Sequence, residues 1–340
     1  MSNARQNVIR AHSGLLLWAL LVGLSFPVVG LMSDGLPPLL LAALRFVIAA
    51  LAVLPWVWRG PNPWPSLPGL ALYTLMGLCL AGFFGATFWA AAHQATALSM
   101  AALFVSVPPT AYCLGRWVGV EPRAGGLLAI LALGAVGALG LALAQTGGQL
   151  SELRLGIAEA VFFAGCLGSA LYPVLSKWGL ARAWLPRQAP LRTFWSLLAG
   201  GVLAGSLGLI WEAPQALASL TLADGLLLVY LGVFSTGMTF WLQQRATFVL
   251  TPGAVMVYSY LVPLVSMLVL FIGQSQRIGW HWLPGSLLVL LAIALLLHRD
   301  ATKGQTSGGQ LTAATMDPRG SAIQAEPAHS GASPRALSTH

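Results

Sequence analysis

Residues 125–144 read GGLLAILALGAVGALGLALA, twenty consecutive residues without a charged or hydrogen-bonding side chain. An α-helix of this length rises about 30 Å, which matches the thickness of the hydrocarbon core of a bilayer. The stretch therefore predicts a transmembrane helix. Its glycines at 134, 137 and 140 stand three residues apart, and we expect them to let another helix pack closely against it.

Nine further runs of this kind lie on both sides of that stretch, each nearly free of charge and about long enough to span a bilayer. They cover residues 14–32, 38–56, 69–92, 97–115, 157–175, 193–211, 225–243, 253–272 and 280–297. Hydrophobic residues make up 57% of the 340 residues and charged residues only 8%, against about 25% charged in soluble proteins. The sequence thus predicts an all-α integral membrane protein with ten transmembrane helices and excludes a soluble domain.

Positive residues are divided unevenly between the two sides of the membrane. With the N-terminus in the cytoplasm, 14 of the 17 Lys and Arg residues fall on the cytoplasmic side, Arg154 and Arg277 fall in outside loops, and Arg45 lies within a span. This excess predicts that both termini are cytoplasmic. The topology and contact with anionic lipid explain the net charge of +8, so we expect no nucleic-acid partner. Residues 299–340 lack apolar periodicity and are expected to form a disordered cytoplasmic tail.

Weak internal repetition divides the ten spans into two sets of five. The corresponding features are Phe26-Pro27-Val28 with Tyr172-Pro173-Val174, Phe88-Trp89 and Ala95-Thr96 with Phe240-Trp241 and Ala246-Thr247, and Pro108 thirteen residues before Glu121 with Pro263 thirteen before Gln276. Because five is odd, the second set crosses the membrane in the opposite sense. Inverted repeats are typical of secondary transporters, with a site near the midplane where the halves meet. The alternative is that the two halves share only their hydrophobic composition.

In their order and spacing, these features resemble the drug/metabolite transporter superfamily, in its ten-span branch built from two EamA repeats. The features that match over residues 14–298 are Trp18, Phe26-Pro27, Arg45-Phe46, Ala95-Thr96, Ala101-Ala102, Pro108, Gly115, Glu121, Ala246-Thr247, Pro263 and the region of Gly273. The sequence departs from the pattern at Ala19, where Gly is common, and at Gln276, the counterpart of Glu121. We therefore expect a cytoplasmic segment at 1–13, one EamA repeat at 14–145 and a second at 155–298, in a multi-pass protein of a bacterial inner membrane.

Ionisable groups within the spans are few, and each is costly in a bilayer. Arg45 lies about 10 Å from the outer end of the second span, counted at 1.5 Å per residue, while Glu159 and His93 lie at the outer ends of the sixth and third. One interpretation is a polar cluster that lines the external mouth, with Arg45 paired to Glu159. The other is that these side chains reach the interface and are wetted there.

Other polar and aromatic side chains are candidates for contact with a solute. His93-Gln94 at the outer end of the third span and Gln243-Gln244 at the inner end of the eighth are candidate gate rims, or simply polar helix ends. By the resemblance, the candidates on cavity-lining spans are Trp18, Trp89, Tyr172, Trp241, Tyr258 and Tyr260, with helix packing as the alternative. Pro27, Pro108, Pro173 and Pro263 are expected to kink their helices.

These features predict a secondary transporter that exports a small metabolite, an amino acid or an amphipathic drug-like solute by alternating access, with a channel or sensor as the alternative. The chain has no Walker sequence, no His-Glu-x-x-His and no Gly-x-Ser-x-Gly, so we expect neither ATP hydrolysis nor an intramembrane enzyme. We expect no metal or cofactor; the expected partners are the solute and membrane lipid. By the resemblance, the fifth and tenth spans could form a homodimer contact. Arg45 favours a carboxylate, provided that it faces the cavity.

Overall fold

The computed structural model describes residues 3–33, 35–59, 64–273 and 279–315. Within these ranges the chain is helical, and ten helices are long and apolar enough to cross a membrane, which confirms the expected fold class. In seven spans the chain forms one continuous α-helix. These helices are α1 (Asn3–Val29), α2 (Pro38–Val57), α3 (Leu67–Ala92), α6 (Gly125–Gln145), α7 (Ile157–Ala181), α8 (Ala189–Trp211) and α13 (Leu283–Thr315). Short helical turns lie between spans at Leu150–Glu152 and Pro214–Ser219, and a third, Trp280–Trp282, begins the tenth span.

The other three spans are interrupted. The fourth consists of α4 (Ala97–Phe104) and α5 (Val107–Val118), and the ninth of α11 (Pro252–Met256), the 3₁₀ turn η4 (Val257–Tyr260) and α12 (Leu261–Gly273). The eighth contains α9 (Leu222–Tyr230), a π-helical segment η3 (Leu231–Met238) and α10 (Thr239–Val249). π-Helical segments are rare and often lie at functional sites.

The candidate kink prolines relate differently to these interruptions. Pro108 lies in the first turn of α5, directly after the break in the fourth span, and Pro263 lies in the first turn of α12, directly after η4. In contrast, α7 runs through Pro173 without a break, and α1 ends two residues after Pro27. The interruptions therefore occur at corresponding places in the two halves, in the fourth and ninth spans.

Thr96 caps the start of α4, and the residue in the same position before α11 is Thr251. The two threonines are 155 residues apart, as are Pro108 and Pro263. The correspondence of Thr96 with Thr247 is therefore wrong by four residues, since Thr247 lies inside α10. The alignment of the two halves failed here because Thr96 and Thr247 both follow an alanine among apolar residues, and so short a match does not fix which residues correspond.

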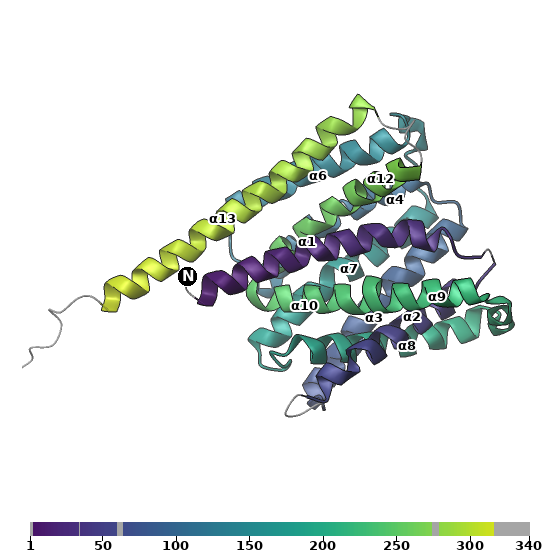
Figure 1. Cartoon of the computed structure of the whole chain (residues 1–340), viewed down its shortest axis with the longest axis horizontal. Coiled ribbons are helices and arrows are strands. Elements are labelled where there is room, and N and C mark those ends of the chain that lie inside the picture. Colours follow the sequence, from purple (N-terminus) through teal and green to yellow (C-terminus); the bar gives the residue numbers. More distant parts are fainter. Residues whose placement is uncertain (1–2, 34, 60–63, 274–278, 316–340) are drawn as a thin grey trace, which may run out of the picture.

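Small residues allow the spans to pack closely in pairs (Figure 1): α2 lies along α8, α3 along α7, and α6 along α13. Helix α3 also packs against α8, where a Cβ atom on Gly77 would lie 2.6 Å from the backbone nitrogen of Gly200. Likewise, a Cβ atom on Gly137 would lie 2.8 Å from the backbone nitrogen of Val289. The close helix contact expected from the glycines of residues 125–144 is confirmed, with α13 as the partner of α6.

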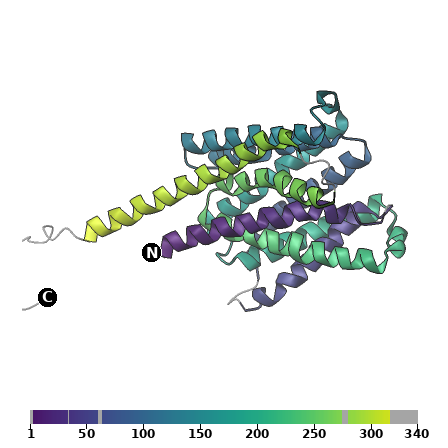
Figure 2. The same cartoon turned by 45° about the horizontal axis from the view of Figure 1, so that its top comes forward.

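Helix α13 does not end where the apolar pattern ends. It continues to Thr315 and extends beyond the rest of the bundle, at the end where α1 begins (Figures 1 and 2). The sequence predicts a disordered tail from residue 299, whereas the structure continues α13 through residues 299–315. A helix that the tenth span has already nucleated can be extended without a new nucleation cost, even through residues of modest helix propensity. The remainder of the expected tail, residues 316–340, lies outside the described residues.

Candidate functional site

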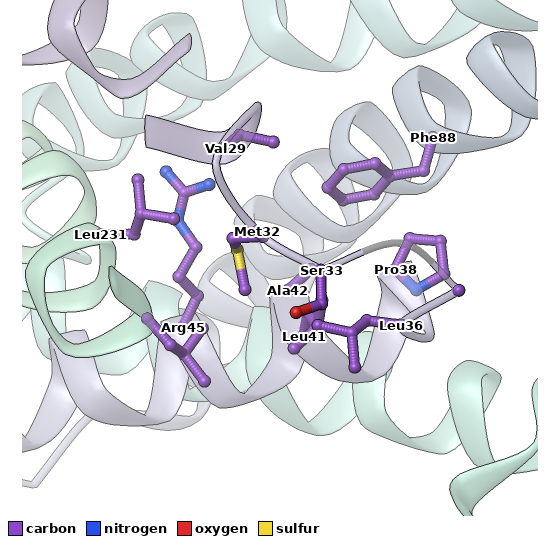
Figure 3. Close-up of a pocket in the computed structure, with 12 residues that line it drawn as sticks. Val29, Met32, Ser33, Leu36, Pro38, Leu41, Ala42, Arg45, Phe88 and Leu231 are labelled. Atoms are coloured by element: carbon purple, nitrogen blue, oxygen red, sulfur yellow. The ribbon is translucent and has the colours of Figure 1, made fainter. Parts of the chain in front are cut away.

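A cavity of about 250 Å³ opens at the end of the bundle where α1 ends and α2 begins (Figure 3). Its wall is mostly apolar and comes from α1, the following loop, α2, α3, α9 and η3. The lining residues are Val29, Met32, Ser33, Gly35, Leu36, Pro38, Leu41, Ala42, Arg45, Phe88, Leu228 and Leu231. Arg45 is the one Lys or Arg among them, and it is therefore the centre of the candidate site.

Two carboxylates hold the segments around this cavity in place. Glu212 accepts hydrogen bonds from the backbone N–H groups of Leu39 (2.8 Å) and Leu40 (3.0 Å), in the first turn of α2. Helix N-termini leave N–H groups unpaired and favour a negative charge, so Glu212 both satisfies and stabilises this end. Asp224 caps α9 through Thr221 and also binds the backbone N–H (2.9 Å) and hydroxyl (2.8 Å) of Ser33. Glu212 thus serves backbone donors, and Asp224 serves both backbone and hydroxyl donors.

Arg45 extends from α2 towards the π-helical segment η3. Its Nε donates to Thr236 Oγ1 (2.8 Å), a terminal nitrogen donates to Ser235 Oγ (3.1 Å), and the guanidinium lies 5.3 Å from the centre of the Phe84 ring. A charge at the bilayer centre costs about 2.5–3.5 kcal/mol on insertion scales. The hydroxyls and the aromatic ring offset part of that cost, but none of the three carries a negative charge. Only 8% of Arg45 is exposed.

Arg45 and Glu159 do not pair, so the interpretation that joined them is wrong. Glu159 instead accepts a hydrogen bond from the backbone N–H of Gly156 (2.9 Å), the N-cap residue of α7, and so satisfies a backbone donor at the start of this helix. This position favours a carboxylate because the helix dipole is positive there. The spacing Gly156-x-x-Glu159 is typical of a helix N-terminus and could have indicated this role. His93 is exposed and stacks on Trp89, so the structure does not gather the three groups into one cluster.

A second buried polar network lies between α7, α8 and α10. Gln244 Oε1 accepts hydrogen bonds from Ser176 Oγ (2.5 Å) and Arg192 Nε (3.0 Å), and Gln244 Nε2 donates to the Tyr172 hydroxyl (2.8 Å). Arg192 also donates to the backbone carbonyls of Gln244 (2.5 Å) and Pro186 (2.6 Å). Arg192 and Gln244 are both fully buried. This network fixes three spans of the second half relative to one another.

The interpretation of Gln243 and Gln244 as a surface gate rim is therefore wrong. Both are buried, at 5% and 0% exposure, because the eighth span continues to Val249 instead of ending at Gln243. Gln243 makes one weak hydrogen bond, from Nε2 to the sulfur of Met256 (3.4 Å). Their first-half counterparts differ: His93 and Gln94 are exposed at the end of α3. The two segments are thus not equivalent rims.

The aromatic candidates do not form one cavity wall. Tyr258 and Tyr260 are buried in η4, and Tyr260 donates to the carbonyl of Val105 in the break of the fourth span (3.4 Å). Trp18 is buried in the core around α1. Trp241 stacks on Trp56, which is half exposed. Trp89 is 39% exposed. Of the six candidates, Tyr260 directly joins the two interrupted spans.

His12 and Asp300 form a polar contact that sequence reasoning missed. His12 Nδ1 lies 2.8 Å from the Tyr258 hydroxyl, and His12 Nε2 lies 3.3 Å from a carboxylate oxygen of Asp300. All three are buried, and they link α1, η4 and α13. Sequence reasoning missed His12 because residues 1–13 were expected to lie before the first span, whereas α1 begins at Asn3.

Glu121 occupies the loop between α5 and α6, outside the membrane-spanning segments. Its side chain is buried against Gly115 and Gly253 and accepts a hydrogen bond from the backbone N–H of Gly253 (2.8 Å). Burial raises the pKa of the Glu121 carboxyl above its ordinary value, and its hydrogen bond to Gly253 and the charges of Arg299 and Lys177 only partly oppose this. Glu121 thus links the end of the fourth span to the start of the ninth. Its expected counterpart, Gln276, lies outside the described residues.

Comparison with known proteins bears on what this fold does. The model of the EamA-like transporter family matches residues 9–143 and again 156–298. The chain is 26% identical over 281 residues to the "Uncharacterized inner membrane transporter YedA" of Escherichia coli, in strains K12, O6:H1 and O157:H7. The match covers 82% of this chain and 87% of that protein. One crystal structure shares the fold with a TM-score of 0.68 and 18% identity, over 86% of this chain and 98% of the other. The chain belongs to the EamA-like transporter family, with two copies of the family's repeat.

Proposed function

We propose that this membrane transporter is a secondary exporter that moves a small metabolite, an amino acid or an amphipathic drug-like solute by alternating access. The observation that carries the proposal is the pair of interrupted spans, the fourth and the ninth, at corresponding places in two repeats of five helices. Interrupted helices at the interface of inverted repeats are typical of transporter substrate sites. The Tyr260 hydroxyl, bonded to Val105, connects the two interruptions and would have to move when the halves rearrange.

Orientation is part of the same proposal. The excess of Lys and Arg on one side of the membrane favours cytoplasmic termini, and the related Escherichia coli protein is described as an inner membrane transporter. In that orientation the cavity around Arg45 opens to the outside, and Glu121 lies on the cytoplasmic side. An exporter with its cavity open outwards is in the state that has just released solute.

Transport by purified protein in liposomes tests the proposal. Proteoliposomes would be offered a panel of radiolabelled amino acids, aromatic carboxylates and cationic dyes, with and without an imposed proton gradient. We expect saturable uptake of at least one class above the level of protein-free liposomes. Saturable uptake only under the gradient would indicate proton coupling, and uptake without it would indicate facilitation or exchange. If no member of the panel moved faster than in protein-free liposomes, the transporter proposal would lose its support.

A further inference from the structure

We propose that Arg45 and the apolar wall of the cavity form a binding site for a monocarboxylate that has an apolar body and no ammonium group. The inference rests on the proposed function and names the class of solute that this cavity accepts. Arg45 supplies the charge at the cavity, and Leu41, Phe88 and Leu231 supply apolar surface (Figure 3). Leu228 adds to that apolar surface.

The charge of Arg45 has no anionic partner among the residues that the structure describes. Its two side-chain hydrogen bonds go to the hydroxyls of Ser235 and Thr236, which are neutral. A guanidinium has five N–H donors in a planar fork, so three remain for another acceptor. Carboxylates match that fork because two parallel hydrogen bonds can form at once. An incoming carboxylate would therefore neutralise the charge and satisfy donors that the protein leaves available.

Among the described residues, the two carboxylates that hold the segments around the cavity are already occupied. Glu212 accepts from two backbone N–H groups of α2, and Asp224 accepts from Ser33 and Thr221. Neither lines the cavity. Asp34 lies outside the described residues, and the experiment below therefore includes a variant of it.

The second buried arginine of the bundle shows what a structural role looks like. Arg192 is fully buried, donates to the side chain and backbone of Gln244 and to the backbone of Pro186, and does not line the cavity. Three of its five N–H donors bond to the protein itself, one from each guanidinium nitrogen. Arg45 has fewer partners and lines a cavity, and this contrast points to a solute as its missing acceptor.

The composition of the cavity wall also says what the solute lacks. An amino acid would bring an ammonium group, and an ammonium group in a desolvated site needs acceptors or a negative charge. The described lining contains no Asp or Glu, and Ser33 is its single hydroxyl side chain, already bonded to Asp224. The apolar side chains instead favour an aliphatic or aromatic body. A carboxylate without an ammonium group fits better than a zwitterion.

Binding of three probes of similar shape to the purified full-length protein tests this inference. Phenylacetate carries one negative charge, phenylacetamide is neutral, and phenylglycine adds an ammonium group to phenylacetate. Isothermal titration in chloride-free buffer should give a Kd for phenylacetate at least about tenfold lower than for either other probe, as expected for a charged hydrogen-bonded contact. Arg45→Gln should remove this preference, and Arg45→Lys should keep part of it because the charge remains. Arg187→Gln, which removes the same charge from an exposed position on another loop, should leave it unchanged.

Several results would overturn the inference. They are equal affinity for phenylacetate and phenylacetamide in the wild type, an unchanged preference in folded Arg45→Gln, and competition by chloride at equal concentration. A preference that emerges only in Asp34→Asn would assign Asp34 as the partner of Arg45 and would also overturn it. Because binding is measured without transport, a neutral or cationic solute that is transported while phenylacetate is not bound would remove this inference and leave the proposed function intact.

Discussion

The network around Gln244 makes a quantitative prediction about stability. Gln244→Leu removes three side-chain hydrogen bonds: one with Arg192, one with Ser176 and one with Tyr172. Hydrogen bonds between neutral side chains in membrane proteins contribute about 0.6 kcal/mol each, and a buried bond to a charged group contributes about 1.5–3 kcal/mol. We therefore expect Gln244→Leu to lower the free energy of unfolding by about 3–4 kcal/mol. Most of that loss comes from the Arg192 Nε, which is left unpaired in the interior.

Gln243→Leu is the matched control, since it is the same change at the neighbouring position of the same helix. Gln243 is also buried, but its one side-chain bond is the weak contact with Met256, so we expect a loss below about 1 kcal/mol. Unfolding in mixed micelles by increasing SDS, followed by tryptophan fluorescence, measures both variants against the wild type. If both variants lost the same small amount, Gln244 would be behaving as a solvated residue at a helix end, and the reasoning about the buried network would be refuted.

Three further predictions follow from other parts of the structure. The raised pKa of Glu121 means that the folded protein favours the protonated carboxyl, so this group stabilises the fold at low pH and loses that effect as pH rises above the ordinary pKa of a glutamate. Glu121→Gln should therefore flatten the fall in Tm with rising pH above that point, and an unchanged slope would contradict the assignment. Gly77→Val should destabilise the protein by more than about 2 kcal/mol because its side chain would meet the α8 backbone, whereas Gly82→Ala, with open space around it, should change SDS unfolding little. Alkaline phosphatase fused to the C-terminus should be inactive in intact cells and a fluorescent protein fused there should fluoresce, and the reverse pattern would place that end outside.

The ten spans could be predicted from the sequence because the thickness of a bilayer sets one length for every apolar run. The predicted ends of the spans were less accurate where a polar residue follows the apolar run. The eighth span was expected to end at Gln243 and instead continues to Val249, since Gln244 finds its partners inside the bundle. Hydropathy measures the free-energy cost of burying a polar side chain that has no hydrogen-bond partner. Whether a partner is present depends on the tertiary structure, which the hydropathy of a segment does not contain.

The candidate site was only partly predictable. Arg45 stood out because a charge within a span needs a reason, but its partners could not be inferred. Ser235 and Thr236 face it because the chain forms a π-helical segment there, and nothing in the residues 231–238 indicates that conformation. The pairing of Glu159 with Arg45 was one of two interpretations and rested on charge alone, whereas the spacing of Glu159 from Gly156 indicated a local role. A carboxylate can bond to a backbone N–H only three residues away in the chain, and at Glu159 this local bond forms in place of a pairing with a distant span.

Counterflow in proteoliposomes tests alternating access most directly. Vesicles are loaded with a high concentration of the best solute from the transport panel and diluted into a trace of the same solute carrying a radiolabel. A carrier that exposes its site to one side at a time exchanges solute across the membrane, so the label should accumulate transiently above its outside concentration. A channel would let both pools run down together. Label that never exceeds the outside concentration, despite saturable uptake by the same vesicles, would contradict alternating access.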